Sequence, residues 1–322
     1  MNTRIDLKDR KILFELNINS RQSNEKIARK VGLSKQAVAV RIKKLQDEEI
    51  IDYFFVKLNP TILGFMHIKI YLKLYNLTPN KEKELINDLN QQKGVFWLCS
   101  LRGKYDLVVS VYAKSISDFS KHYDKLFDKW REYILERNVF LLEEAYTYSK
   151  AYLLPKKEPE EFVYSSGKEE KISLDTLDQK LLSILNKNAR HPLIDIAIKL
   201  DVSPDTVSYR IKNLQKKGVI VGFDTKINFA NINENFYIVS IKLQRMDKKK
   251  YDELKGFLKN NKNVITFIKI ISDFDIELEV EVLERKDFDD LLTSLRERFP
   301  LEVKDYEILE VTKEHRITYF PF

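Results

Sequence analysis

The chain has 322 residues, with 56 basic and 49 acidic side chains that give a net charge of +7. This is about twice the usual length of a single domain, so we expect two or more cores. A hydrophobic content of 43% supplies enough apolar surface to fold and excludes wholesale disorder. The single cysteine, Cys99, excludes an intrachain disulfide and a four-thiolate zinc site.

Membrane insertion and secretion are both disfavoured. The N-terminal segment meets charged side chains at Arg4 and Asp6, before an apolar signal sequence could form. No uninterrupted apolar run approaches the ~20 residues that cross a bilayer. We therefore expect a cytoplasmic protein with no membrane partner.

An internal repeat organises the chain. Shifted by 169 residues, positions 6–59 align without a gap with positions 175–228, and roughly 22 pairs are identical. The segment between the copies is rich in Pro, Lys, Glu, Ser and Gly, which is typical of an exposed tether, with a structured loop as the alternative. The expected units are a helix-turn-helix domain at 1–60, an α/β domain at 61–154, a linker at 155–171, a second helix-turn-helix domain at 172–228 and a second α/β domain at 229–322.

The start of each copy predicts three short helices and a strand. Asp6 suits the N-cap of the first helix, and Ser34 suits the N-cap of a third helix with apolar residues at helical spacing. Gly32 suits the tight turn between the second and third helices. In the second copy Asp201 replaces this glycine, and Asp is one of the few other residues that tolerate a left-handed conformation. The spacing predicts helix-turn-helix units of winged-helix type.

The remainder of each copy alternates strands and helices. In the first copy we expect strands near 67–74, 95–101, 106–113 and 139–146, with helices near 80–92 and 115–130. The order βαββαβ predicts a ferredoxin-like sheet with helices on one face. The fold class is therefore α+β, with two repeats of a helix-turn-helix domain followed by a ferredoxin-like domain.

Positive charge concentrates on the helical units. Residues 1–60 carry 13 basic and 8 acidic side chains, and residues 172–228 carry 9 and 6. A helix that begins at Ser34 can enter the major groove, with Gln36 suited to adenine, while lysines and arginines neutralise phosphates. The partner we expect is double-stranded DNA, and the candidate contacts in the first copy are Arg21, Ser34, Lys35, Gln36, Ala39, Arg41, Lys43 and Lys44.

The second recognition helix differs at its exposed positions. Pro204 and Asp205 replace Lys35 and Gln36, and Asp205 would repel a nearby phosphate or accept a hydrogen bond from cytosine. We expect backbone contacts with altered or relaxed base preference. The candidate contacts in this copy are Arg190, Ser203, Thr206, Ser208, Arg210 and Lys212.

A family pattern at the start of the chain is carried by Asp6, Asp9-Arg10-Lys11-Ile12-Leu13, Asn19-Ser20-Arg21-Gln22-Ser23, Ile27-Ala28, Val31-Gly32-Leu33-Ser34, Val38, Arg41-Ile42 and Leu45. This pattern resembles the Lrp/AsnC family of transcription regulators. The resemblance covers nearly the whole chain as two consecutive copies. It implies a DNA-binding domain followed by an α/β domain that pairs subunits and often binds an amino acid or related effector. The family's Gly-x-Tyr-Asp loop is similar to Gly103-Lys104-Tyr105-Asp106, which makes Gly103, Tyr105 and Asp106 candidate effector contacts.

The second copy of that loop, Ser272-Asp273-Phe274-Asp275, lacks the glycine that would let a ligand or another backbone approach. Two half-dimers on one chain suggest that the α/β sheets pair within the chain around a pseudo-two-fold axis. Glu277, Glu279 and Glu281 alternate along one strand, and the opposing face can carry Lys69, Lys73 and Arg102. A charge-complementary pairing of the two sheets and simple solvation of both faces are open alternatives, and so is self-association of tandem chains.

Enzyme functions find little support. No HExxH, nucleophile-elbow, P-loop or GxGxxG motif occurs, and none of the four histidines is duplicated. We expect no catalytic residues, metal site or cofactor. Siroheme (tetrapyrrole) decarboxylases share this architecture and would need a basic, histidine-lined pocket, for which His67 and His122 are candidates. A non-specific architectural DNA-binding protein is the third alternative.

Overall fold

The computed structural model describes residues 5–92, 94–155, 157–165, 171–232 and 234–320. Each copy begins with three helices and one strand. They are α1 (Leu7–Ile18), α2 (Asn24–Val31), α3 (Lys35–Asp47) and β1 (Ile51–Leu58) in the first copy, and α6 (Thr176–Lys187), α7 (Leu193–Leu200), α8 (Pro204–Lys216) and β7 (Ile220–Ile227) in the second. Gly32 and Asp201 both end their helices in the left-handed conformation, with φ of +66° and +54°. The two helix-turn-helix units are confirmed.

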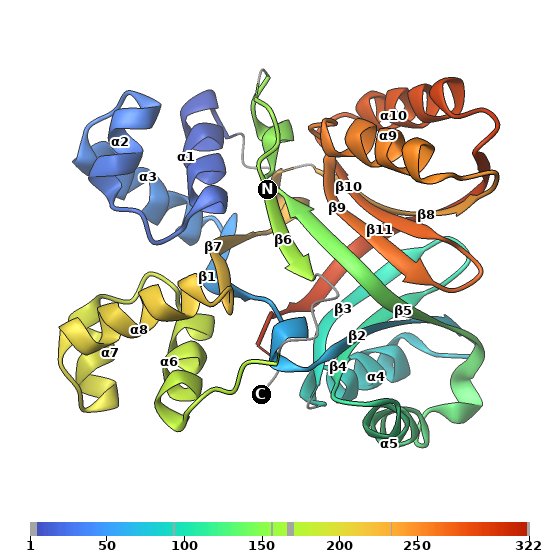
Figure 1. Cartoon of the computed structure of the whole chain (residues 1–322), viewed down its shortest axis with the longest axis horizontal. Coiled ribbons are helices and arrows are strands. Elements are labelled where there is room, and N and C mark those ends of the chain that lie inside the picture. The colour runs from blue at the N-terminus through green and yellow to red at the C-terminus, as the bar shows by residue number, and fades with distance from the viewer. Residues whose placement is uncertain (1–4, 93, 156, 166–170, 233, 321–322) are drawn as a thin grey trace.

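The two helix-turn-helix units are joined into one body. Strands β1 and β7 pair antiparallel, and α1 packs against β7 while α6 packs against β1. The Ser20 amide donates to the Phe223 carbonyl at 2.9 Å, and the Ala189 amide donates to the Phe54 carbonyl at 2.8 Å. These related contacts and a single shared hydrophobic core fix the two units relative to each other. In Figure 1 they lie together at one side of the molecule.

The α/β part of each copy has the predicted βαββαβ order. In the first copy the elements are β2 (Met66–Leu74), α4 (Pro79–Gln91), β3 (Val95–Arg102), β4 (Leu107–Ala113), α5 (Ile116–Phe127) and β5 (Ile134–Tyr148). In the second copy they are β8 (Asn235–Leu243), α9 (Lys248–Lys259), β9 (Val264–Ile271), β10 (Ile276–Val282), α10 (Arg285–Arg298) and β11 (Val303–Ile317). Short 3-10 helices occur at Thr61–Leu63, Arg131–Tyr133, Ala151–Leu153 and Phe229–Ile232.

The strands of the two copies close into one barrel. The hydrogen-bonded order is β2-β4-β3-β11-β8-β10-β9-β5, and β5 pairs again with β2. Each closing strand reaches the other copy, because β5 pairs with β9 and β11 pairs with β3. Helices α4 and α5 cover the outside of one half and α9 and α10 cover the other (Figure 1). The copies therefore pair within the chain, as two subunits of a dimer would.

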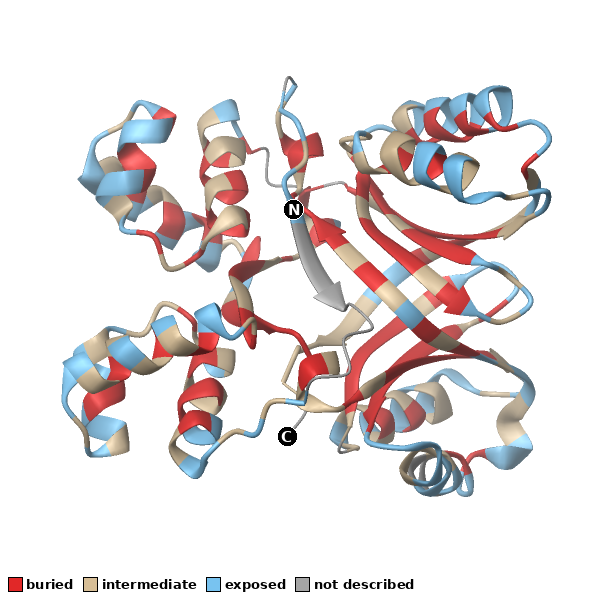
Figure 2. Cartoon of the chain, viewed as in Figure 1, coloured by how far each residue is buried: buried red, intermediate tan, exposed pale blue. Residues whose placement is uncertain are grey.

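The barrel interior is packed with aromatic side chains from both copies. The aromatic members of this cluster include Tyr71, Phe96, Trp97, Tyr105, Phe140 and Phe236. Figure 2 shows the barrel strands as mostly buried, whereas the outer faces of the surrounding helices are exposed. Within the described part of the chain, no helix is both long and apolar enough to cross a membrane.

The segment 155–171 differs from the expected tether. Part of it forms β6 (Glu161–Ser165), which pairs antiparallel with β5 and extends the barrel wall by one strand. The composition of this segment predicted an exposed loop, because β5, the strand with which it pairs, lies outside the segment and leaves no signal in it. Residues 156 and 166–170 of this stretch lie outside the described residues.

Candidate nucleic-acid interface and central cavity

Helix α3 has one buried and one exposed face. Val38, Ile42 and Leu45 are buried against the other helices, as the apolar spacing predicts. The opposite face exposes Ser34, Lys35, Gln36, Ala39, Lys43 and Lys44. Ser34 is the N-cap, and its hydroxyl accepts a hydrogen bond from the Ala37 amide at 3.1 Å. The basic face is therefore accessible.

Val40 is a further exposed residue of α3 that the charge-based analysis missed. The residue is 70% exposed, although valine is usually buried. It lies next to Ala39 on the accessible side of the helix, where an apolar contact with a thymine methyl group is the chemistry available. The signal in the sequence was a valine that does not fit the apolar stripe.

Arg41 and Arg210 hold the third helix of each unit to the first. Arg41 Nη1 donates to Asp6 Oδ2 at 2.8 Å and to Asp9 Oδ1 at 2.7 Å. Arg210 Nη1 makes the equivalent bonds to Asp175 and Asp178 at 2.6 and 2.8 Å. Hydrogen bonds to the aspartates raise the pKa of Arg41. Both arginines are thus engaged within their own unit.

Arg21 and Arg190 lie at the junction between the two helix-turn-helix units. Arg21 Nη1 donates to the carbonyls of Ala189 and His191, and Arg190 Nη1 donates to those of Ser20 and Gln22. Burial lowers the pKa of Arg21, and the neighbouring Arg190 lowers it further. The two guanidinium groups therefore face the opposite unit within the protein.

Helix α8 presents a different surface. Pro204 is its first residue, and the Ser203 hydroxyl caps the helix by accepting from the Thr206 amide at 3.1 Å. The Ser203 and Thr206 hydroxyls also lie 2.9 Å apart in a hydrogen bond. Tyr209 and Lys212 are exposed, while Thr206 and Ser208 are half-buried. The accessible groups at the start of α8 include the carboxylate of Asp205, in contrast to the lysine and glutamine of α3.

The Gly103 loop packs against the second copy of the chain. Gly103 has a φ of +138°, and a Cβ atom there would lie 2.8 Å from Leu309 Cδ2. The Tyr105 hydroxyl donates to Glu136 at 3.2 Å, and Asp106 accepts from the Leu74 amide at 2.7 Å. The three candidate effector residues thus make contacts within the chain. Asp275 accepts from the Leu243 amide at 2.6 Å, so the second copy keeps the aspartate contact without the glycine.

An ion-pair cluster joins the two halves inside the barrel. Lys69 Nζ lies 2.7 Å from both Glu277 Oε1 and Glu279 Oε1, and the Tyr71 hydroxyl donates to Glu277 at 2.6 Å. Burial disfavours the charged form of Lys69, but Glu277 and Glu279 outweigh this and raise its pKa. The charge-complementary pairing is confirmed for Lys69. Arg102 also crosses to the second copy but pairs with Glu310, and Lys73 pairs with Asp106 of its own copy.

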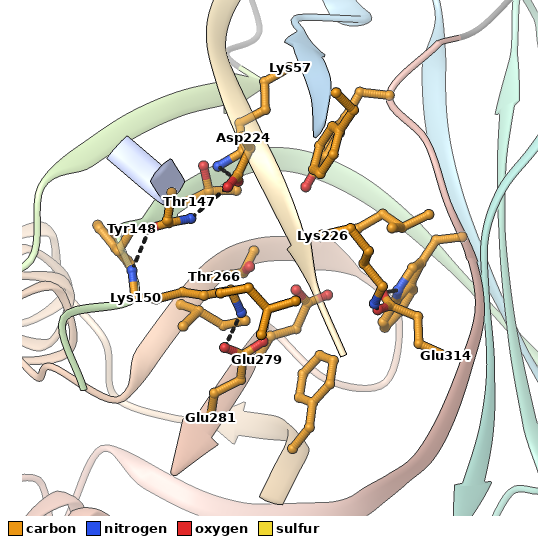
Figure 3. A pocket seen from close by; sticks show the side chains of 18 of the residues that line it. Lys57, Thr147, Tyr148, Lys150, Asp224, Lys226, Thr266, Glu279, Glu281 and Glu314 are labelled. Carbon is orange, nitrogen blue, oxygen red and sulfur yellow. Dashed lines mark hydrogen bonds and ion pairs between the residues drawn. The ribbon is translucent and has the colours of Figure 1, made fainter. Parts of the chain in front are cut away.

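A cavity of about 100 Å³ lies where the helix-turn-helix pair meets the barrel. Lys57 and Asp224, from the paired strands β1 and β7, lie 2.7 Å apart. Lys226 of β7 pairs with Glu314 of β11, and Lys150 pairs with Glu281 of β10. Figure 3 shows the Lys57–Asp224 pair and the Lys226–Glu314 pair on different sides of the cavity. The cavity lining therefore contains ion pairs that join the helix-turn-helix pair to the barrel, and ion pairs within each of these two parts.

His67 lines the same cavity. It is buried, and the edge of its ring contacts the Phe96 ring at a centroid distance of 4.5 Å. Burial, with the positive charge of Lys69, places the pKa of His67 well below its usual value. The side chain of His122, the other candidate for tetrapyrrole chemistry, lies outside the described residues. The cavity lysines beside His67 are paired with carboxylates, which leaves little excess positive charge.

Known families match both helix-turn-helix units. The AsnC-type helix-turn-helix domain matches residues 5–46, and a winged helix-turn-helix DNA-binding family matches residues 174–221. Among solved structures, the siroheme decarboxylase NirDL has a TM-score of 0.61 and 15% identity, with 97% of this chain and 94% of that chain covered. This degree of identity shows a shared fold and carries no argument for a shared activity.

Curated relatives correspond to one half of the chain. An uncharacterized HTH-type transcriptional regulator of Pyrococcus abyssi is 32% identical over 143 residues, which cover 95% of that protein and 44% of this chain. The HTH-type transcriptional regulator Ptr1 of Methanocaldococcus jannaschii is 37% identical over 117 residues, which cover 78% of that protein and 36% of this chain. The leucine-responsive regulatory protein of Haemophilus influenzae is 27% identical over 145 residues, which cover 87% of that protein and 44% of this chain. Because regulators of half its length match a chain built from two such copies, the protein is a tandem-duplicated member of the Lrp/AsnC family of helix-turn-helix transcriptional regulators.

Proposed function

We propose that one chain binds an operator as an intrachain pseudo-dimer, with α3 and α8 on successive major-groove faces. The observation that carries this proposal is the joining of the two helix-turn-helix units by β1–β7 pairing and a shared core. A rigid pair of units fixes the spacing of two half-sites, which for dimeric helix-turn-helix proteins is about one helical turn or a multiple of it. Because α3 and α8 differ in their exposed residues, the two half-sites differ in sequence.

The first unit supplies most of the base recognition. Lys35, Gln36 and Ala39 lie on the exposed N-terminal part of α3, the part of a recognition helix that reaches base edges. Lys43 and Lys44, nearer the end of the helix, and the capping Ser34 contact phosphates. In the second unit Thr206 and Ser208 face the groove, and Lys212 and Ser203 contact the backbone. Asp205 disfavours a phosphate at its position, so the second half-site is the weaker one.

Four of the predicted DNA contacts act as positioning residues in this proposal. Arg21 and Arg190 fix the angle between the units because their guanidinium groups bind carbonyls of the opposite unit. Arg41 and Arg210 fix each recognition helix on its own unit through paired aspartates. Their unused guanidinium donors remain able to contact a phosphate at the edge of the interface.

We further propose that the protein is not an enzyme and works in the cytoplasm, where its DNA target lies. A carboxylate-rich tetrapyrrole needs a cationic pocket, whereas the lysines that line the cavity are paired with carboxylates. The Gly103 loop is engaged by the second copy of this chain, so an amino-acid effector there would have to bind on its outer side. That side also offers a surface for self-association of tandem chains.

Binding of the full chain to DNA fragments tests this function. The variant Lys35→Ala/Gln36→Ala/Lys43→Ala removes exposed side chains from α3 without touching its buried face. We expect at least a tenfold loss of affinity for a selected site, because several phosphate and base contacts are removed. The matched control is Lys83→Ala, an exposed lysine on α4, which should leave affinity unchanged. Equal affinity for the triple variant and the wild type would contradict the proposal.

A further inference from the structure

Two of the three chain segments that pass between the helix-turn-helix pair and the barrel meet at one buried cluster. Tyr152 follows β5 on the segment that leads to the second helix-turn-helix unit, and Glu234 directly precedes β8. Glu281 lies on the barrel strand β10. Tyr152 also belongs to the hydrophobic core that the two helix-turn-helix units share. The cluster therefore joins this shared core to the barrel.

Tyr152 contacts both carboxyl groups through one hydroxyl. Its oxygen lies 2.7 Å from Glu234 Oε2 and 2.6 Å from Glu281 Oε2. A tyrosine hydroxyl has one proton to donate, whereas an ionised carboxylate can only accept. The two short contacts therefore need a second proton, carried by one of the carboxyl groups. Because Lys150 Nζ binds Glu281 Oε2 directly, Glu234 is the group that holds this proton.

The hydrogen bonds then form one ordered chain. Protonated Glu234 donates to the Tyr152 hydroxyl, the hydroxyl donates to Glu281, and Glu281 also accepts from Lys150. Glu234 Oε1 is buried with no hydrogen-bond partner among the described residues, which costs less for a neutral acid than for a carboxylate. Burial raises the pKa of Glu234 well above its usual value, and the charge of Glu281 raises it further. Burial acts in the same direction on Glu281, but Lys150 outweighs it and lowers the pKa.

The positive charges around the cluster are bound elsewhere. They are three lysines, each paired with a carboxylate: Lys150 with Glu281, Lys57 of β1 with Asp224 of β7, and Lys226 of β7 with Glu314 of β11. Asn17 of α1 extends this network, because its side chain accepts from the Lys150 amide and donates to Asp224, each at 2.8 Å. A negative charge on Glu234 would therefore be buried beside lysines already bound to other carboxylates, which is costly.

The other copy shows that the fold does not require acidic groups at this place. In the repeat alignment Glu234 corresponds to Phe65, and Glu281 corresponds to Tyr112. These two aromatic residues are buried, and their rings contact each other at a centroid distance of 6.2 Å. Aromatic packing thus fills the equivalent position. The carboxyl pair is a property of one junction between the helix-turn-helix pair and the barrel, and its counterpart lacks it.

We propose that Glu234 and Glu281 form a single proton-binding site that makes the junction between the helix-turn-helix pair and the barrel sensitive to pH. With the proton bound, Tyr152 joins both carboxyl groups and holds the two chain segments against β10. When the proton leaves, the hydroxyl can donate to only one carboxylate, and the like charges of Glu234 and Glu281 repel each other in a buried place. The Glu234 segment then separates from β10. This inference does not depend on what the protein binds.

The pH dependence of stability tests the proton site in the full chain. An unfolded chain releases the Glu234 proton near its usual pKa of 4.5, whereas the folded chain keeps it. The stability that the proton contributes is therefore fully present below pH 4.5 and is lost as the pH rises toward the folded-state pKa, by as much as tenfold per pH unit in the unfolding equilibrium constant. Glu234→Gln keeps a neutral side chain that can donate to Tyr152 and has no such proton to lose.

Between pH 5 and pH 8 the unfolding constant, measured by chemical denaturation, should rise at least tenfold more in the wild type than in Glu234→Gln. His315 and Lys226 titrate in both proteins, so their contributions cancel in this comparison. The matched control is Glu302→Gln, since Glu302 is also buried but lies in the turn after α10, 3.9 Å from Lys250. This control should keep the wild-type pH dependence. An equal pH dependence in the wild type and Glu234→Gln would overturn the proposal.

Hydrogen exchange locates the opening. At pH 8 the amides of residues 149–153 and 229–232 should exchange at least tenfold faster in the wild type than in Glu234→Gln, and the comparison at one pH removes the intrinsic pH dependence of exchange. The amides of α4 serve as the internal reference and should exchange alike in both proteins. Unchanged exchange at the junction, or the same acceleration in α4, would contradict an opening at this place.

Infrared spectroscopy of the wild type gives a second test that needs no variant to fold. The folded chain at pH 7 should show the carbonyl band of a protonated carboxyl group, and this band should disappear over the pH range in which exchange at the junction accelerates. A spectrum without a protonated carboxyl band at pH 7 would overturn the proposal.

Discussion

The Lys69 ammonium group of the first copy lies 2.7 Å from the Glu277 carboxylate of the second, inside the closed barrel. Glu279 accepts from the same lysine at the same distance, and both Lys69 and Glu277 are buried. The contact is an intrachain version of a subunit interface. The corresponding residues of the repeat, Ile238 and Val108, are apolar, so the ion pair occurs once, whereas a symmetric homodimer would repeat it.

Lys69→Met tests this contact. The change leaves Glu277 buried without its cation, so we expect a loss of about 3–5 kcal/mol in the free energy of unfolding, measured by chemical denaturation. Lys69→Met/Glu277→Gln should recover part of the loss. The control is Lys73→Met, because the Lys73–Asp106 pair is about one-third exposed and a pair of that kind contributes about 1 kcal/mol or less. Similar losses for Lys69→Met and Lys73→Met would argue against the role of the buried cluster.

Gly103→Ala tests the close approach of the two copies. The added Cβ atom would meet the Leu309 side chain at 2.8 Å and the Ile308 carbonyl at 3.2 Å, at a φ that favours glycine. We expect the protein to be destabilised by about 2 kcal/mol. Gly256→Ala is the control, since nothing lies within 4 Å of a Cβ there and the residue is inside α9. It should stabilise the protein by about 0.5–1 kcal/mol. The idea fails if Gly103→Ala is as stable as the wild type.

Arg21→Ala tests the positioning role of the arginines. The change removes hydrogen bonds to the Ala189 and His191 carbonyls, so the free energy of unfolding should fall by about 1–3 kcal/mol. If the contact sets the angle between the units, the sites selected by this variant should show a wider range of half-site spacings. Unchanged stability, together with a reduced salt dependence of DNA binding, would instead indicate a direct phosphate contact.

His315 makes stability depend on pH. Burial and the positive charge of Lys313 lower its pKa from 6.5 to about 4. The unfolded chain therefore binds a proton between pH 6.5 and 4 that the folded chain does not, so folding stability falls as the pH falls through this window. Allowing for partial exposure, the contribution is about 1–2 kcal/mol. His315→Gln should lose less stability than the wild type between pH 7 and pH 4 in thermal denaturation; an equal loss would contradict the assignment.

Lys43→Ala and Gln36→Ala should affect DNA binding differently. Lys43 is assigned to a phosphate, so its loss should weaken all sequences alike and reduce the salt slope of the binding constant by about 1. Gln36 is assigned to a base, so its loss should relax specificity at one position by about 1–3 kcal/mol with little change in the salt slope. Binding titrations at several salt concentrations on matched and mismatched sites separate the two. A salt slope that falls equally in both variants would contradict these assignments.

The helix-turn-helix units were accessible to sequence analysis because their signals are local. Ser34 and Asp6 cap the helices as expected, and Asp201 adopts the left-handed conformation in place of glycine. The pairing of Lys69 with the glutamate strand was one of two alternatives that the alternating charges left open, the other being solvation of both faces, and the structure decides between them. These features depend on residues close in sequence or on simple alternation.

Other features depend on contacts between distant segments. The crossing of β5 and β11 to the other copy joins strands more than a hundred residues apart, and no local pattern encodes it. Arg21 resembles a DNA contact by charge alone, because its carbonyl partners belong to the second unit. The cavity was missed because Lys57 and Lys226 look like surface residues until the paired strands bury them.

Selection from a random double-stranded DNA library by the full-length wild type, compared with Lys35→Ala/Gln36→Ala/Lys43→Ala, tests the central claim most directly. We predict an enriched site with two unequal halves about one helical turn, or a multiple of it, apart. The variant should lose enrichment of one half and retain the other. Binding without any enriched sequence, falling steeply with salt, would contradict the account and favour a non-specific architectural protein.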